Sequence, residues 1–377
     1  MIVGRSLRSS IGALLALVTL VVACAPTRAA PAVQSKGSNE LDAIVAGARR
    51  EGELSLSWTP GFLDAPGELD RHIDLFNKAY KLNLRVKFTP ARTASENAAR
   101  LLEEVRPGEA SFTDVFLGTE AQITSLARAA SLTSEMWTAW APNVGNLKLL
   151  APGGTAVQIQ TRIPGITYNS QRLTGGDIPR SLNDLLGARF RGRVATTPDV
   201  STLDRLASPD VWAPDRALSF IRRLAPQIGG VIQCGEEGRI MNGEFDALVY
   251  DCGSARAAQL KAEGALIGWS VPSDAAFLRY LYMGVPTRAA HPNAAKLWVN
   301  YMLGRQAQDL MFQYQFADHH LLPGSRSFGE VDRATKAGVK FYELTVESLQ
   351  AEEARGFKST APEIQTLLLR GLPPVRR

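Results

Sequence analysis

The stretch PGITYNSQRLTGGDIPRSLNDLLGARFRGRVATTP, residues 164–198, contains the most informative pattern for the class of fold. It begins with a short strand-like run at residues 164–170. Residues 178–186 then have helical spacing, with Gly187 just beyond their end, and residues 191–197 are again typical of a strand. A strand, a helix and a second strand in succession predict a parallel sheet covered by helices.

The same alternation continues on both sides of this stretch. Strand patterns are found at residues 53–58, 82–88, 113–118, 240–250, 266–271 and 275–286. Helical patterns are found at residues 39–52, 68–80, 93–105, 120–130, 213–226, 255–264 and 291–316. The order of these elements predicts an α/β fold in which helices flank the sheets.

One strand pattern ends abruptly in a group of reactive side chains. The segment ALVYDCGS, residues 247–254, is apolar up to Val249 and then continues with Tyr250, Asp251 and Cys252. Three interpretations are open from these residues. They form a metal site, they surround a nucleophilic cysteine, or they mark the end of a buried strand that opens onto a binding cleft.

The first residues have the features of an export signal. Arg5 and Arg8 precede the apolar run 11–22, which is shorter than the roughly 20 residues that a membrane span needs. We therefore expect residues 1–23 to be a signal peptide. The sequence LVVAC that ends it resembles the lipobox of bacterial lipoproteins, in which the cysteine, here Cys24, is lipidated. The alternative is an ordinary signal peptide with an incidental cysteine.

Length, charge and missing motifs narrow the class of protein. Residues 24–39 are rich in Ala, Pro, Ser and Gly and predict a flexible tether, and the rest is long enough for about two domains. Without Arg5 and Arg8 the formal charge falls from +5 to +3, too mild to indicate nucleic-acid binding. The common local signatures of nucleotide binding, serine hydrolysis and zinc proteolysis are absent, which disfavours an enzyme.

The two cysteines that follow the tether, Cys234 and Cys252, form an even pair in a chain expected to be exported. An oxidising compartment favours a disulfide between them. A nucleophilic Cys252 would need a histidine to lower its pKa, and none of the four histidines is close to it in the sequence. We therefore prefer a disulfide, although spacing alone does not establish that the two residues meet.

Four blocks, taken in order, resemble the bacterial extracellular solute-binding proteins that serve ABC importers. These blocks are residues 113–118, 164–198, 242–250 and 284–313. The branch that binds ferric iron, thiamine or polyamines is the most similar. The resemblance extends over about residues 40–345.

This resemblance implies a type II periplasmic-binding-protein fold, in which two α/β lobes with parallel or mixed sheets are joined by a hinge. Lobe 1 would contain residues 40–165 and 278–377, and lobe 2 residues 166–277. It also implies a monomer without catalysis or cofactor that passes a small solute to an ABC permease. Such a protein lies in the periplasm or on the cell surface, held to the membrane by its lipid alone.

The resemblance and the strand ends together suggest residues that contact the solute. Three of them also have a structural alternative: Trp58 as a core residue, Tyr168 as a hinge residue and Thr197 as a helix cap. We expect no metal site. The candidate ligand-binding residues are Trp58, Thr59, Thr119, Tyr168, Thr197, Tyr250 and Asp251.

Two alternative functions remain open. Ferric-binding relatives end the strand equivalent to residues 247–254 with two adjacent tyrosines, but Cys252 and Gly253 occupy those positions here. An iron receptor would therefore need atypical ligands such as Tyr250 and Asp251. An exported enzyme of the same two-lobed shape would use Cys252, Tyr250 or Asp251 as its catalytic group.

Two further groups are expected to be structural. Trp137 and Trp140, three residues apart, predict one buried helical face. Asp318, His319 and His320 have metal-binding side chains, but adjacent histidines in a loop point apart, so we expect this trio to lie on the surface.

Overall fold

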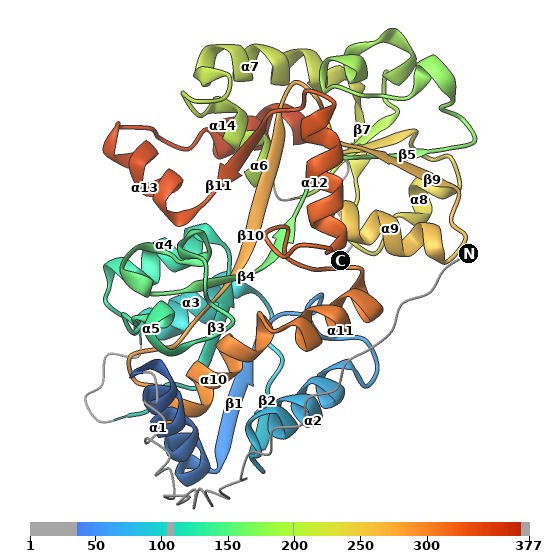
Figure 1. Cartoon of the computed structure of the whole chain (residues 1–377). Coiled ribbons are helices and arrows are strands. Elements are labelled where there is room, and N and C mark those ends of the chain that lie inside the picture. The colour runs from blue at the N-terminus through green and yellow to red at the C-terminus, as the bar shows by residue number, and fades with distance from the viewer. Residues whose placement is uncertain (1–35, 104–108, 199, 371–377) are drawn as a thin grey trace, which may run out of the picture. The chain divides into compact units, whose positions relative to one another are not determined.

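The computed structural model describes residues 36–103, 109–198 and 200–370 (Figure 1). The predicted signal peptide, Cys24 and nearly all of the tether lie outside the described residues. Two sheets organise the rest. Fourteen helices accompany them in the described part of the chain: α1 (Lys36–Glu51), α2 (Glu68–Tyr80), α3 (Ala94–Glu103), α4 (Glu120–Arg128), α5 (Trp137–Trp140), α6 (Ser201–Asp204), α7 (Ala213–Leu224), α8 (Gly238–Met241), α9 (Ser254–Ala262), α10 (Pro292–Met302), α11 (Arg305–Gln315), α12 (Arg326–Lys336), α13 (Val346–Ala354) and α14 (Ala361–Leu369).

The first sheet has six strands in the order β11-β10-β3-β1-β2, with β4 also paired to β10. Its parallel pairs are β1 with β2, β1 with β3 and β10 with β11, whereas β10 runs antiparallel to β3 and β4. Apolar residues of its strands pack against helices such as α10 in a continuous core. The strands are β1 (Glu53–Ser57), β2 (Arg85–Phe88), β3 (Val115–Gly118), β4 (Val157–Arg162), β10 (Ala276–Gly284) and β11 (Phe341–Leu344).

The second sheet has five strands in the order β7-β6-β8-β5-β9. Strand β6 pairs parallel with β7 and β8, and β5 pairs antiparallel with β8 and β9. Its strands have their own core, which includes buried residues of α7. The strands are β5 (Ile166–Asn169), β6 (Val194–Thr196), β7 (Ile228–Val231), β8 (Ala247–Val249) and β9 (Ile267–Ser270). The two mixed sheets with flanking helices confirm the predicted α/β class.

The stretch 164–198 differs from its prediction in two respects. Strands β5 and β6 are not neighbours, because β8 lies between them, and β5 runs antiparallel to β8. The expected helix is replaced by three short 3-10 turns: η3 (Gly175–Asp177), η4 (Asn183–Leu186) and η5 (Ala188–Phe190).

A distant carboxylate explains why this segment turns early. Asp274 accepts hydrogen bonds from the backbone amides of Leu182 (2.8 Å) and Asn183 (3.2 Å). Asp184 does the same for the amides of Arg180 and Ser181. Backbone amides of residues 180–183 thus donate to carboxylates of side chains and not to carbonyl groups of a preceding helical turn. The spacing of apolar residues gives no sign of these bonds.

The chain passes from the first sheet to the second between β4 and β5 and returns between β9 and β10 (Figure 1). Gly165 lies at the first crossing, where a Cβ atom would come within 2.6 Å of the Trp269 ring and the Ser270 carbonyl oxygen. This close approach requires glycine.

At the end of the chain α14 packs against α7, and its Ile364 and Leu368 join the core of the second sheet. The family resemblance instead implied that residues 278–377 belong to lobe 1. The limits of the two lobes stay predictions.

The remaining structural expectations have mixed outcomes. Trp137 and Trp140 are buried, at 1% and 3% exposure, as predicted. The surface position expected for Asp318, His319 and His320 is wrong, because all three are buried in contacts with the first sheet. None of the helices in the described ranges is both long and apolar enough to cross a membrane.

Four further 3-10 turns are η1 (Leu147–Leu149), η2 (Pro152–Gly154), η6 (Arg205–Ala207) and η7 (Ala225–Gln227).

Candidate functional site

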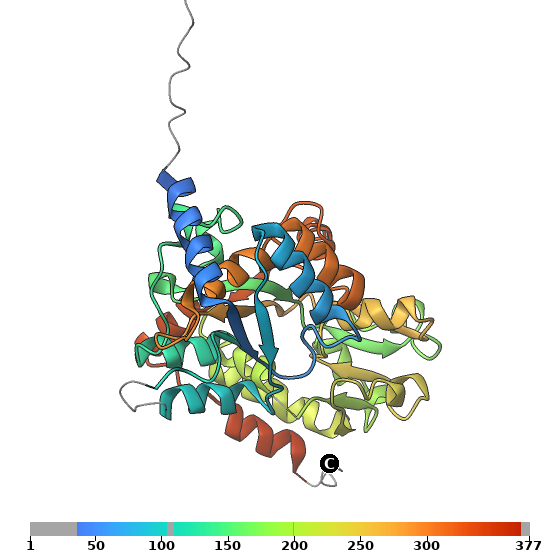
Figure 2. The ribbon, with the colours of Figure 1, turned by 90° about the horizontal axis from the view of Figure 1, so that it is seen from below.

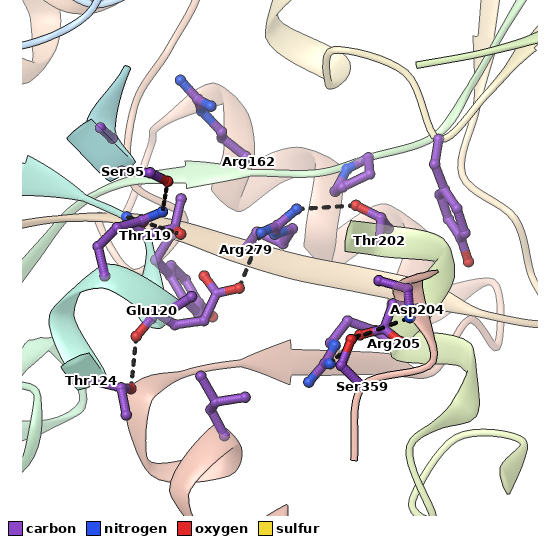
Figure 3. A pocket seen from close by; sticks show the side chains of 18 of the residues that line it. Ser95, Thr119, Glu120, Thr124, Arg162, Thr202, Asp204, Arg205, Arg279 and Ser359 are labelled. Carbon is purple, nitrogen blue, oxygen red and sulfur yellow. Dashed lines mark hydrogen bonds and ion pairs between the residues drawn. The ribbon is translucent and has the colours of Figure 1, made fainter. Parts of the chain in front are cut away.

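A cavity of about 780 Å³ lies between elements of the two sheets, and we call it the inter-sheet cavity (Figure 3). Helices α3 and α4 and strands β4 and β10 contribute its wall on the first sheet's side. Helix α6 and the loop after β8 contribute the wall on the second sheet's side, and α13 and the start of α14 close it. Its charged lining residues are Glu120, Arg128, Arg162, Asp204, Arg205, Asp251, Arg279 and Glu353.

The start of α4 is held by its own side chains. The Thr119 amide and hydroxyl donate to the Gln122 side-chain oxygen, at 2.9 and 2.7 Å. The Thr124 hydroxyl donates to the Glu120 carbonyl one turn back. These bonds keep the first turn of α4 at the cavity, where its amide ends favour negative charge.

Arg279 connects the two walls. It projects from β10, and its guanidinium donates to the Glu120 carboxylate (3.0 Å) on α4 and to the Thr202 hydroxyl (3.1 Å) on α6 (Figure 3). A charge-assisted pair inside a protein is stronger than one on the surface. A movement of α4 relative to α6 would therefore have to change the contacts of Arg279.

A second arginine organises the wall formed by α6, α13 and α14. Arg205 donates to Asp204 (2.5 Å) and to Glu352 (2.9 Å), and all three side chains are largely buried. Asp204 also accepts from the hydroxyls of Ser359 (2.9 Å) and Thr360 (2.8 Å). This network gives each of the three charged side chains a partner and holds the segment before α14 against α6.

The loop after β8 lies at the cavity, but Tyr250 does not offer its hydroxyl there. The Tyr250 side chain is 3% exposed, packs against Phe277, and donates to the Ala275 carbonyl at 2.7 Å. Burial and nearby Asp274 raise its pKa well above the ordinary value. These contacts favour a structural role over the predicted contact with a solute.

Asp251 is similarly engaged by the protein. One of its carboxylate oxygens accepts from the amides of Gly165 (3.0 Å) and Gly253 (2.9 Å), and the other accepts from the Thr167 hydroxyl. Burial raises its pKa, and the hydrogen bonds oppose that shift. The carboxylate thus ties the loop after β8 to the first crossing and to β5.

Cys252, the next residue, is joined to Cys234 as a disulfide, with the two Cα atoms 5.7 Å apart. Both cysteines line the inter-sheet cavity. The bridge leaves Cys252 without a thiol that could act as a nucleophile.

The other predicted ligand-binding residues fall into two groups. Thr119 and Thr197 line the inter-sheet cavity, whereas Trp58, Thr59 and Tyr168 are not among its lining residues. Trp58 is 2% exposed and packs in the core of the first sheet, and Tyr168 is 8% exposed within the core of the second. For these two the structural alternative fits better.

Sequence reasoning missed the arginines. Arg162 ends the buried strand β4, and Arg279 interrupts the mostly apolar strand β10. A charged side chain within a buried strand is uncommon without a partner or a function, and that signal would have identified both.

Two observations on the described residues concern a metal: the placement of acidic, cysteine and histidine side chains, and the partners of three tyrosines in β10 and the loop after β8. No group of three or more His, Cys, Asp or Glu side chains is placed there to hold a metal ion. The hydroxyls of Tyr250, Tyr280 and Tyr282 are bound to Ala275, Glu343 and Gln158, and burial raises the pKa of each.

Comparison with known families agrees with these features. Residues 68–316 match the family model of bacterial extracellular solute-binding proteins. The chain belongs to this family. The match confirms the resemblance that the sequence blocks suggested, and the family's defining activity is to bind a solute outside the cytoplasm. A comparison with curated proteins gave no match.

Solved structures of this fold resemble the chain over most of its length. Iron-bound HitA from Pseudomonas aeruginosa has a TM-score of 0.63 at 18% identity, covering 84% of this chain and 98% of HitA. The spermidine/putrescine substrate-binding protein PotD from Streptococcus pneumoniae has a TM-score of 0.60 at 14% identity, covering 84% and 99%. AgtB from A. tumefacien R10, in complex with agropinic acid, has a TM-score of 0.60 at 16% identity, covering 85% and 99%.

Proposed function

We propose that this protein is the substrate-binding component of an ABC importer and that it holds a small solute in the inter-sheet cavity. The observation that carries the proposal is a cavity of about 780 Å³, lined on one side by strands and helices of the first sheet and on the other by α6 and loops that follow strands of the second. That volume is in the range of small-molecule sites. Structurally similar proteins that carry the ABC-transporter description, such as PotD, support the assignment.

The proposed mechanism is capture followed by docking. A solute in the cavity would contact α4 on one wall and α6 on the other, so it would favour the arrangement in which both contacts are made. The permease would then recognise that arrangement. The shared contacts of Arg279 with Glu120 and Thr202 give this coupling a physical route.

We also propose that the protein is a lipid-anchored monomer in the periplasm or at the cell surface and that it is not an enzyme. The lipobox-like residues before Cys24 support the anchor. The engagement of Cys252, Tyr250 and Asp251 in structural contacts supports the absence of catalysis, because each candidate catalytic group is already bonded within the protein.

A cavity-filling variant tests solute capture. Purified protein would be screened by thermal shift against carboxylates, phosphates, polyamines, thiamine and ferric iron, because a ligand at a hundred times its dissociation constant stabilises a receptor by about 2.7 kcal/mol. Ala121→Trp places a large side chain at the cavity wall and should abolish binding of any hit. Ala262→Trp, on an exposed position of α9, is the matched control and should bind normally.

Two outcomes would contradict the proposal. One is a panel in which no compound of any class stabilises the wild-type protein. The other is a compound that binds Ala121→Trp and the wild-type protein with the same affinity. Turnover of a bound compound would instead favour an enzyme.

A further inference from the structure

Arg162 lines the inter-sheet cavity and has no ion-pair partner among the described residues. It ends β4, lines the cavity and is exposed within it. Among the described residues its guanidinium makes no hydrogen bond or ion pair, and in Figure 3 no dashed line reaches it. All five of its N–H donors are therefore open to a ligand.

The other arginines of the cavity have acidic partners. Arg279 pairs with Glu120, Arg205 lies between Asp204 and Glu352, and Arg128 pairs with Glu353. Arg162 thus adds a positive charge that no acidic side chain of the described residues contacts.

The position of Arg162 makes this charge costly. In the antiparallel pair of β4 and β10, Arg162 lies directly opposite Arg279. Like charges at such positions destabilise a sheet. The Arg162 side chain is accessible from the cavity, but desolvation by the surrounding protein and the charge of Arg279 lower its pKa to about 10, while Glu120 opposes the shift. An anion bound at Arg162 would relieve this repulsion and supply the missing partner.

We propose that the solute is an organic anion whose carboxylate or phosphate-type group is bound by the Arg162 guanidinium. The planar fork of arginine matches both groups through two parallel hydrogen bonds. The start of α4, which lines the same cavity, favours negative charge as well. The remaining volume would hold the body of the solute. This inference rests on the proposed solute-capture function.

Binding assays on matched probes test the inference. Succinate and citrate represent carboxylates, and inorganic phosphate and glycerol 3-phosphate represent phosphates. Succinamide and glycerol are their neutral counterparts, and putrescine is a cationic probe. We expect at least one anion to bind wild type more tightly than its neutral counterpart. Arg162→Gln should lower the affinity for that anion by about tenfold to a hundredfold. Arg162→Lys should lower it less, because lysine keeps the positive charge but cannot form the two parallel hydrogen bonds of arginine.

Two controls separate binding from folding. Arg305→Gln removes an exposed arginine that pairs with Asp309 outside the cavity, and it should bind the anion as wild type does. Without ligand, Arg162→Gln should melt at or above the wild-type temperature, because it removes the repulsion from Arg279. A lower melting temperature of the unliganded variant would show that Arg162 has a structural partner and would overturn the inference.

The results also distinguish this inference from the function on which it rests. If putrescine or a neutral compound binds equally to wild type and Arg162→Gln, the protein is a solute receptor but the anion assignment is wrong. If no anion of the panel binds, the assignment is likewise wrong. If no compound of any class binds, the proposed function itself fails.

Discussion

At the scale of single residues, Tyr250 is held in an unusual backbone conformation by its contacts in the core of the second sheet. It follows a buried strand and has a left-handed backbone, with φ at 44°. An ordinary side chain in this conformation is strained and persists where its surroundings hold it. Here the surroundings are Phe277, which the ring contacts, and the Ala275 carbonyl, to which the hydroxyl donates.

Substitution of Tyr250 should therefore affect stability before it affects binding. Tyr250→Ala should lower the free energy of unfolding by about 3–5 kcal/mol, because it leaves a cavity in the core of the second sheet. Tyr250→Phe should cost about 1 kcal/mol, since only the hydrogen bond to Ala275 is lost. Urea unfolding followed by tryptophan fluorescence would measure both. A variant as stable as wild type but defective in solute binding would restore Tyr250 to the solute site.

Glu68 should make the stability of the folded protein depend on pH. It begins α2 with no exposed surface, and its Oε2 accepts from the Ala65 amide (3.3 Å) and the Gln315 side chain (2.9 Å). Its Oε1 is buried without a hydrogen-bond partner among the described residues. Burial raises its pKa from 4.5 to about 7, an effect that nearby Asp64 reinforces and the two hydrogen bonds oppose.

The sign of the pH dependence follows from this shift. A carboxyl with a raised pKa holds its proton more tightly in the folded state, so stability falls as pH rises from about 4.5 to about 7. Glu68→Gln removes this titration. The stability of Glu68→Gln relative to wild type should increase across that range by on the order of 2 kcal/mol. Thermal unfolding at pH 4.5 and pH 8 would measure it, with the exposed Glu263→Gln as the control. A difference that stays constant with pH would contradict the assignment.

At the scale of elements, the loops that end strands build the wall of the cavity on the second sheet's side. Cys234 follows β7 and Cys252 follows β8, and the disulfide joins the two loops. Asp251 fastens the same loop to the first crossing through Gly165. Two independent ties therefore fix the loop that precedes α9.

Removal of the disulfide should be costly. The two cysteines are 18 residues apart in the sequence, and a closed loop of that length contributes about 3 kcal/mol by restricting the unfolded chain. The double variant Cys234→Ser with Cys252→Ser should lose about that much in urea unfolding, with the reduced wild type as the control. Thiol labelling of denatured, unreduced protein should leave both cysteines unmodified. Labelling of both would show that the mature protein lacks the bridge.

At the scale of the whole molecule, anchoring and solute capture are separate properties of the chain. The predicted anchor depends on Cys24 and the tether, whereas capture depends on the folded unit that begins at Lys36. A lipid chain contributes about 0.8 kcal/mol of membrane affinity per buried methylene group. Loss of the lipid should therefore release the protein without changing its solute affinity.

Cys24→Ser tests this separation. We expect the wild-type chain in the membrane fraction and the variant in the soluble fraction or unprocessed, with equal solute binding by the purified folded unit. Ser35→Ala, in the same tether, is the matched control and should stay with the membrane. An unmodified Cys24 in the mature wild-type chain, seen by mass spectrometry, would contradict lipidation.

The α/β class, the succession of most strands and helices along the chain, and the family could all be predicted from the amino-acid sequence. These properties depend on local periodicity and on short blocks such as residues 242–250, which survive without knowledge of distant contacts. The sequence also suggested the pairing of Cys234 with Cys252, because composition and expected compartment limited the choices.

The order of the strands within each sheet and the hydrogen-bond partners of the buried polar groups became visible only in three dimensions. Local spacing predicted a helix where Asp274 instead binds the amides of Leu182 and Asn183. Local spacing could not reveal that the Tyr250 hydroxyl donates to the Ala275 carbonyl. Nor could it reveal that Arg162 and Arg279 lie directly opposite each other on the paired strands β4 and β10. These contacts join residues far apart in the chain, and their free energies depend on distance and burial that a linear pattern does not contain.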